Sequence, residues 1–199
     1  GSTKGILAAG TSGEVKLVWM PVAAQSQRNA TISLQPNVAW LAAEKTLSAN
    51  AWLRLRFLGG EAERAVLALP DGSSEVEVNG PDVREFRAEG TQLTVFFRGR
   101  ISGSTGLNLN FVCPREGGET FRLPEIKVIS GRIEEGGWTV LSNDTPGLLL
   151  ENSISGLSVA NLSEAPDAVQ GLSWANPVHV YRSDSRTSEA RFDLLLAAP

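Results

Sequence analysis

Residues 64–86 read RAVLALPDGSSEVEVNGPDVREF, and this stretch decides the fold class. The apolar run RAVLAL ends at residues 70–72, where Pro, Asp and Gly supply a fixed φ, a side-chain acceptor and a permissive backbone that together reverse the chain. In EVEVN, Val76 and Val78 alternate with acidic and amide residues, so one face is apolar and the other is polar. The stretch therefore predicts two β-strands separated by a tight turn.

The same alternation of apolar and polar residues recurs along the chain. The further alternating segments are EVKLVW (14–19), TLSANAWLRLRFL (46–58), QLTVFFR (92–98), GLNLNFV (106–112), GWTVLS (137–142), NPVHVYR (176–182) and SEARFDLL (188–195). Residues typical of turns lie between them, and short strands recurring at about ten residues are typical of antiparallel sandwiches and barrels. We therefore predict an all-β protein, an antiparallel β-sandwich of one or two units with at most short helical turns.

Two segments have helical character. VAWLAAEKTL (38–47) has a helix-forming composition and predicts about two helical turns. LSEAPDAVQ (162–170) predicts a second short helix, capped by Ser163. Neither segment is long enough to change the all-β class.

The length of the chain leaves two domain arrangements open. With 199 residues and 42% hydrophobic content, it can bury one large core or two small ones. The composition changes near Gly59-Gly60, which predicts a β-sandwich module over residues 61–199. Residues 1–60 hold at least two strand candidates and form either a small separate subdomain or part of the same sandwich.

Residues 64–112 also resemble a known kind of module. Their order is an apolar strand, an LP-DG turn, VEV-NG-PDV, an aromatic residue, G-x-x-LTV and a glycine-led strand. This order resembles a module of large, envelope-anchored bacterial proteins made of stacked β-sandwiches. The segments LPEIKVISGRIEEGGWTVLS (123–142), ISGLSVANLSEAPDAVQG (154–171) and PVHVYR are similar to the section that follows in those proteins.

The resemblance covers about residues 60–196 and rests on turn and strand signatures. It implies a β-sandwich fold, a periplasmic or cell-surface location, and other β-sandwich modules or envelope proteins as partners. It implies no activity, and residues 1–60 carry no such likeness. Gly1-Ser2 is typical of a cloning remnant, so we expect a signal peptide or anchor to have been trimmed from the natural protein.

Several classes of function are disfavoured by composition. A formal net charge of -4 and a pI near 5.1 give no broad positive field, so nucleic acid is not expected as a partner. The sequence has no apolar run of about 18 residues, which predicts no insertion into a membrane. One cysteine, Cys113, and one histidine, His179, supply neither a zinc site nor the usual nucleophile and base. We predict no metal, no cofactor and no catalytic residue.

The alternative is a carbohydrate-active enzyme of the glycosidase type, or a fragment of one. Such an enzyme needs only two carboxylates roughly 5–10 Å apart. Glu134 and Glu135 are candidates because they lie beside paired glycines and Trp138. Adjacent residues of a strand point to opposite faces, so a solvated hairpin turn is the favoured interpretation of this segment.

A binding surface is predicted on the segment 46–58. Its polar face carries Asn50, Trp52, Arg54 and Arg56, an aromatic plate flanked by amide and guanidinium groups that suits a sugar ring or an extended polymer. Trp52 packed under a neighbouring loop, with the arginine stems over it, is the other interpretation. The remaining tryptophans are expected mostly in the core: Trp19, Trp40, Trp138 and Trp174. We predict a non-catalytic extracytoplasmic module that acts in protein assembly or in binding a ligand such as carbohydrate.

Overall fold

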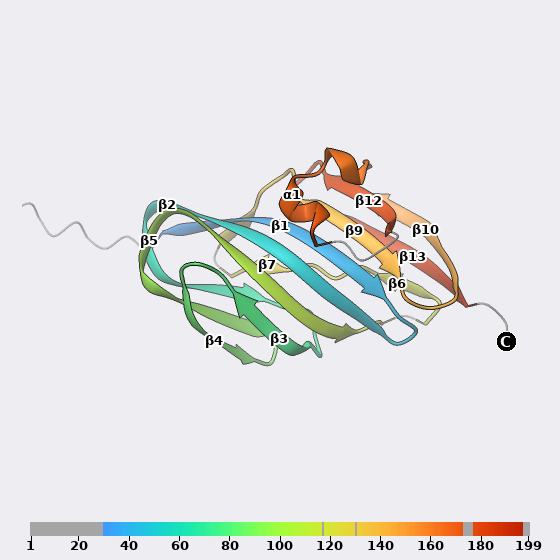
Figure 1. Ribbon diagram of the computed structural model, residues 1–199, viewed down its shortest axis with the longest axis horizontal. Coiled ribbons are helices and arrows are strands. Elements are labelled where there is room, and N and C mark those ends of the chain that lie inside the picture. Colours follow the sequence, from blue (N-terminus) through green and yellow to red (C-terminus); the bar gives the residue numbers. More distant parts are fainter. Residues whose placement is uncertain (1–29, 117, 130, 173–176, 197–199) are drawn as a thin grey trace, which may run out of the picture.

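The computed structural model describes residues 30–116, 118–129, 131–172 and 177–196. These residues form β-strands and two short helical turns, which confirms the all-β prediction (Figure 1). The elements are β1 (Thr31–Ala42), β2 (Thr46–Ala68), β3 (Ser74–Asn79), β4 (Val83–Glu89), β5 (Gln92–Pro114), β6 (Thr120–Arg122), β7 (Lys127–Val128), β8 (Gly131–Ile133), β9 (Trp138–Asn143), β10 (Gly147–Ser155), β11 (Leu157–Val159), η1 (Leu162–Glu164), α1 (Asp167–Gln170), β12 (Pro177–Ser183) and β13 (Glu189–Leu196). The predicted strand at 14–19 lies outside the described residues, as do Trp19 and Trp174.

Two sheets account for the strands of the described residues. The large sheet has the order β11-β12-β9-β1-β2-β5-β3, with β4 on β5, β7 on β2 and β8 on β1. The small sheet has the order β10-β13-β6. Pairing is antiparallel except where β8 and β9 run parallel to β1. No helix in the described part of the chain is long and apolar enough to cross a membrane.

The large sheet folds over on itself because β2 and β5 bend together. The two strands pair along their length, with register shifts between Phe57 and Arg64. Strand β3 pairs with the second half of β5 and β4 with its first half. A Cβ built on Gly72, in the short link from β2 to β3, would lie 2.8 Å from Pro114 Cγ at the far end of β5. The far ends of the β2–β5 ribbon are therefore brought back together, and the ribbon curls at one end of the molecule (Figure 1).

This bend makes the two layers of a sandwich. We call β11, β12, β9, β1, β3 and residues 46–58 and 103–114 the main layer, and β7, β4 and residues 62–68 and 92–97 the folded-back layer. The Phe57 ring of the main layer meets the Phe97 ring of the folded-back layer edge-on, with ring centroids 5.6 Å apart. The sequence left open whether residues 1–60 form a separate subdomain or part of the same sandwich. Strand β2 passes through Gly59-Gly60 as one bent strand, and residues 31–60 lie in the same large sheet as the strands that follow.

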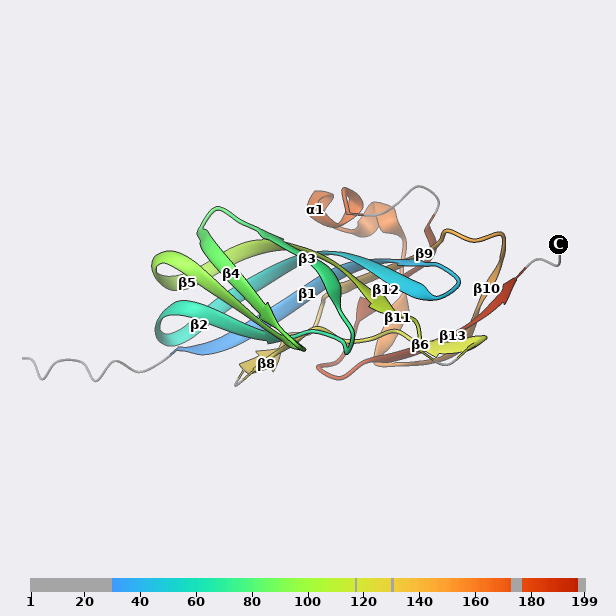
Figure 2. The same cartoon turned by 90° about the horizontal axis from the view of Figure 1, so that it is seen from below.

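Alternation along the strands places apolar side chains between the layers, as predicted. On β2, every second residue from Leu47 to Phe57 is buried, and on β5 the same holds from Leu93 to Phe97 and from Leu107 to Phe111. The small sheet covers the β9–β12 half of the main layer, where Phe192 packs against Tyr181. Figure 2 shows α1 on one side of the main layer and strands β6 and β13 on the other.

The segment around Glu134 and Glu135 is not a hairpin turn, contrary to prediction. Strands β8 and β9 both run parallel to β1, so the chain continues in one direction through residues 134–137. The backbone N–H of Glu134 donates to Leu34 O at 2.7 Å, which holds the connection against β1. Strands β8 and β9, before and after residues 134–137, both pair with β1. Alternation in the sequence does not show that two successive strands share one neighbour.

The two helical predictions have different outcomes. VAWLAAEKTL (38–47) is wrong as a helix: it forms the end of β1 and the start of β2, because neighbours on both faces bury Val38, Ala39 and Trp40. Segment 162–170 does form helical turns, η1 and α1. Ser163 is not their cap, since it lies inside η1, and the residues before η1 and α1 make no side-chain capping bond.

The buried thiol of Cys113 gives a prediction for alkaline pH. Burial raises its pKa to about 11 from the ordinary 9.0, and the charge of Glu116 acts in the same direction. Because the unfolded thiol ionises first, this contribution to stability is present below pH 9 and is lost as the pH rises towards 11. Denaturant unfolding across this range should show stability falling, with a shallower fall in Cys113→Ala. Equal slopes in the two proteins would contradict the assignment.

Candidate binding face

The predicted residues Asn50, Trp52, Arg54 and Arg56 lie together on the outer face of the main layer. Their strand neighbours on β1 are set by register, with Asn37 opposite Trp52, Gln35 opposite Arg54 and Ser33 opposite Arg56. The face is divided into two ends of different character. One end is aromatic and covered, and the other carries arginines and is open.

The aromatic end is covered by the protein's own η1–α1 segment. Trp52 is half-buried and packs against a cluster formed by Ala39, Trp138, Val140, Ala165, Val169 and Leu172. The Asn50 amide donates to Leu172 O at 3.4 Å, which ties this segment to β2. Asn37, buried between the tryptophans, donates to Trp52 O at 3.0 Å and accepts from the Trp138 backbone N–H at 3.2 Å. Much of the aromatic surface available for stacking on a sugar is thus used inside the fold.

The open end carries two guanidinium groups without an acidic partner. Within the described residues, no carboxylate lies at ion-pair distance from Arg54 or from Arg182 of β12. Gln35 Nε2 donates to Gly136 O at 3.3 Å. A Cβ built on Gly136 would lie 3.7 Å from Gln35 Nε2 and 3.9 Å from Arg182 Nη2. Arg182, Gln35 and Arg54 therefore follow one another across the sheet.

The same end includes a tethered carboxylate. Ser33 Oγ donates to Glu134 Oε1 at 2.7 Å, and Arg56 Nη1 lies 3.5 Å from the same oxygen. Arg132 Nε donates to Ser33 Oγ at 3.2 Å, so a second guanidinium joins the network. Glu134 is thus held by its neighbours in a network of hydrogen bonds and an ion pair.

We define the arginine face by Gln35, Arg54, Arg56, Arg132 and Arg182. Four of its five residues carry a guanidinium group. The carboxylate of Glu134 contacts Arg56 directly and is linked to Arg132 through Ser33. The chain as a whole has a formal net charge of -4, so this face departs from the average charge of the protein. Clustered guanidinium groups bind carboxylates through paired N–H donors and raise the local concentration of anions.

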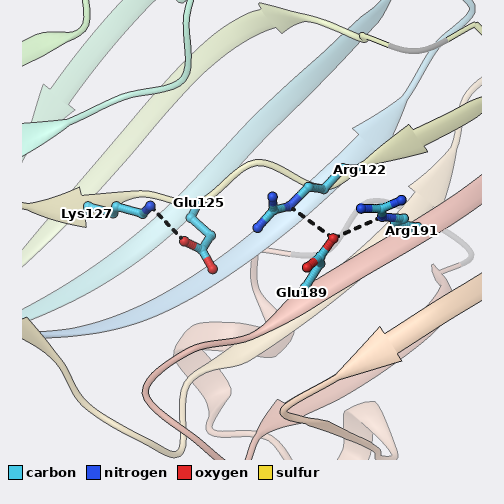
Figure 3. Close-up of polar contacts among 5 residues, drawn as sticks. All are labelled: Arg122, Glu125, Lys127, Glu189 and Arg191. Carbon is cyan, nitrogen blue, oxygen red and sulfur yellow. Dashed lines mark hydrogen bonds and ion pairs between the residues drawn. The ribbon is translucent and has the colours of Figure 1, made fainter.

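Some basic residues elsewhere on the protein are paired with acidic neighbours. On the small sheet, Glu189 Oε1 lies 2.9 Å from Arg191 Nε and 3.7 Å from Arg122 Nε (Figure 3). Nearby, Lys127 of β7 pairs with Glu125 at 3.2 Å. These exposed pairs contribute little to stability. They do compensate the positive charge of that surface. Among the described residues, Arg54 and Arg182 have no acidic partner that would compensate theirs.

The only histidine lies on the inner side of the main layer and caps an edge strand. Its ring stacks on Tyr181, 6.0 Å between centroids, as expected for residues sharing a strand face. His179 Nε2 is hydrogen-bonded to Leu149 O at 3.0 Å, and Asn143 Nδ2 donates to Gly147 O at 3.3 Å. Both carbonyls belong to β10, an edge strand of the small sheet. These caps oppose the addition of a foreign strand there.

Tyr181 closes the same end of the sandwich. Its hydroxyl donates to Glu151 Oε2 at 2.8 Å, which joins β12 of the large sheet to β10 of the small one. Burial, the hydrogen bond to Glu151 and the charge of that carboxylate all raise the pKa of Tyr181 above its ordinary value. Tyr181 is therefore held as a neutral donor.

In the residues that the structure describes, no group of three or more His, Cys, Asp or Glu side chains is placed to hold a metal ion.

Comparisons with known proteins identify the fold. No protein-family model matches the sequence, and no curated protein is similar to it. A mutant M1 zinc metallopeptidase from Deinococcus radiodurans bound to the substrate Tyr-Ser-Ala has a TM-score of 0.53 and 12% identity, over 83% of this chain and 43% of that chain. A two-domain M1 zinc metallopeptidase mutant bound to L-tryptophan has a TM-score of 0.55 and 12% identity, over 84% and 43%. This likeness shows a shared fold, and the chain spans less than half the length of these peptidases.

Sequence reasoning missed three residues of the arginine face. Gln35, Arg132 and Arg182 come from β1, β8 and β12, which lie far apart in the sequence. The antiparallel pairing of β1 with β2 brings Gln35 beside Arg54. The parallel pairing of β8 and β9 with β1, and the pairing of β12 with β9, bring Arg132 and Arg182 to the same face. The alternation in NPVHVYR does place Arg182 with the valines on the face opposite His179, but nothing in the sequence shows which strand lies next to which.

Proposed function

We propose that this chain is a non-catalytic β-sandwich module that assembles with an acidic protein surface through its arginine face. The observation that carries the proposal is the pair Arg54 and Arg182, which have no carboxylate at ion-pair distance among the described residues. Arg56 and Arg132 add charge beside them, while Ser33 and Glu134 fix their positions. Guanidinium groups on a pleated sheet suit a row of carboxylates on a partner.

The burial of Trp52 and Trp138 favours a protein partner over carbohydrate. Trp138 is buried, and Trp52 is half-buried beneath α1, so the stacking surface that sugar recognition uses is reduced. Contact through the sheet face is also favoured over strand addition at β10, because two of its carbonyls are already hydrogen-bonded to His179 and Asn143.

The test is binding of a fluorescent peptide of consecutive glutamates, followed by anisotropy. We expect saturable binding that weakens as salt shortens the screening length to about 8 Å at physiological ionic strength. The double variant Arg54→Gln/Arg182→Gln should weaken binding by about tenfold, since charged interface contacts contribute at least 1.4 kcal/mol together. Equal loss in the control Arg186→Gln, which removes one exposed arginine from the β12–β13 loop, would show that only net charge matters. A polyuronate that binds more tightly than the peptide would point to carbohydrate instead.

A second candidate, a non-catalytic accessory part of an enzyme, is favoured by the fold likeness. The matched M1 zinc metallopeptidases share this fold over 43% of their chains, which leaves more than half of each outside the match. Incubating the protein with zinc and Tyr-Ser-Ala, with amino-acid release followed by chromatography, checks the non-catalytic assignment. We expect no release, and release above that of zinc alone would overturn it.

Location and partner identity stay predictions. The periplasmic or cell-surface location rests on the resemblance of residues 60–196 to envelope modules. If that resemblance reflects kinship, the acidic partner is another envelope protein or a sister sandwich. Fractionation of cells producing the natural full-length protein checks the location, and recovery from the cytoplasm alone would contradict it.

A further inference from the structure

A shallow hollow lies on the outer face of the folded-back layer, away from the arginine face. It is lined by Arg64, Arg87, Glu89, Gln92, Thr94 and Phe96. Strand β5 forms the middle of this face, with β2 on one side and β4 on the other. Register places Arg64 opposite Phe96 and Arg87 opposite Thr94, so the two arginines approach the hollow from opposite sides of β5.

The hollow combines fixed positive charge with neutral donors. Arg87 lies over the Phe96 ring, with Cζ 5.6 Å from the ring centroid, which limits its motion while leaving N–H groups at its edge available. Within the described residues, neither Arg64 nor Arg87 has a carboxylate at ion-pair distance. Thr94 supplies a hydroxyl and Gln92 an amide, and the Gln92 amide lies 3.5 Å from Thr94 Oγ1. Glu89 is the single acid of the lining.

We infer that this hollow binds a single carboxylate group, carried by a peptide end or by an acidic sugar. Two guanidinium groups against one carboxylate leave one positive charge to be balanced by a monovalent anion. Arginine pairs with the planar carboxylate through parallel N–H donors, and Thr94 and Gln92 offer donors to the same oxygens. Glu89 repels a second negative charge, which disfavours dianions such as phosphate.

The test is a titration followed by amide NMR, with N-acetylglycine and glucuronate as carboxylate probes and N-acetylglycinamide as the neutral probe. We expect saturable shifts of the Gln92 side-chain amide and the Thr94 backbone amide with a carboxylate probe and none with the neutral probe. A stronger response to N-acetylglycine indicates a peptide end, and a stronger response to glucuronate indicates a sugar acid. Arg87→Gln should weaken the binding at least fivefold.

Two results would overturn the inference. One is an equal response to the neutral probe, and the other is an affinity unchanged in both Arg64→Gln and Arg87→Gln. The control Arg186→Gln should bind like the original protein, because Arg186 lies in the loop between β12 and β13. The double variant of Arg54 and Arg182 should also retain this binding, so the outcome is independent of that for the arginine face.

Discussion

Replacing Phe97 by alanine should lower the free energy of unfolding by about 3–5 kcal/mol, the usual range for deleting a buried aromatic ring. Phe97 is only 2% exposed and lies where the folded-back layer meets the main layer. Its ring contacts the Phe57 ring edge-on at 5.6 Å, so its removal leaves a cavity and deletes a contact between the layers. Denaturant unfolding measures the change, and thermal unfolding should show a midpoint lower by roughly 10 °C.

The matched control is Phe86→Ala, on the neighbouring strand β4. Phe86 is 37% exposed, so removing the same ring should cost less than about half as much as in Phe97→Ala. If the two variants were equally stable, residues 92–97 would not pack against the main layer, and the folded-back arrangement of β2 and β5 would be incorrect.

Gly137→Ala should destabilise the protein by about 3 kcal/mol, at the upper end of the usual cost of overpacking. A Cβ built on Gly137 would lie 2.2 Å from the backbone oxygen of Pro36. The obstacle is backbone of β1, so it cannot be relieved by a side-chain rotation. Relief requires moving β9 away from β1, which also strains the hydrogen bond from the Ser183 backbone N–H to Gly137 O at 2.8 Å.

Gly99→Ala serves as the control for Gly137→Ala. A Cβ built on Gly99 meets no atom within 4 Å. The new methyl group also reduces the freedom of the unfolded chain, so we expect stability within about 1 kcal/mol of the original protein. A Gly137→Ala protein as stable as the Gly99→Ala protein would mean that β9 does not lie against β1.

Alternation in the sequence was sufficient to predict most strands and their faces. Leu93 and Val95 are buried because alternate side chains of a strand point to the same face, and that face packs against the core. The same holds for Leu107 and Leu109. Short-range turn chemistry located the link from β2 to β3 correctly. These features depend on residues close together in the chain, which a single sequence displays directly.

The bend of β2 and β5 was not predictable in the same way. Gly59-Gly60 is typical of a turn, yet β2 continues through these residues because its partner β5 bends beside it. At the bend, Gly59 of β2 and Gly103 of β5 adopt φ of 73° and 80°. The bend thus depends on two segments more than forty residues apart acting together. A pattern read along one segment predicts a break there instead of a curved pair.

The candidate site was predictable only in part. Period two correctly grouped Asn50, Trp52, Arg54 and Arg56 on one face of β2. It did not show that α1 covers Trp52 or that Arg182 approaches from β12, because both depend on tertiary packing. The binding role of these four residues therefore stays a prediction, and the proposal now rests on the arginines of the face instead of on Trp52.

The most direct test of assembly through the arginine face is to map where the glutamate peptide binds. Backbone amide NMR of the isotope-labelled protein follows every site at once and needs no substitution. We predict saturable, salt-sensitive shifts centred on Gln35, Arg54, Arg56, Gly136 and Arg182, with the β10 edge unaffected. Shifts centred on β10 or β3, or shifts spread over the surface without saturation, would contradict assembly through this face.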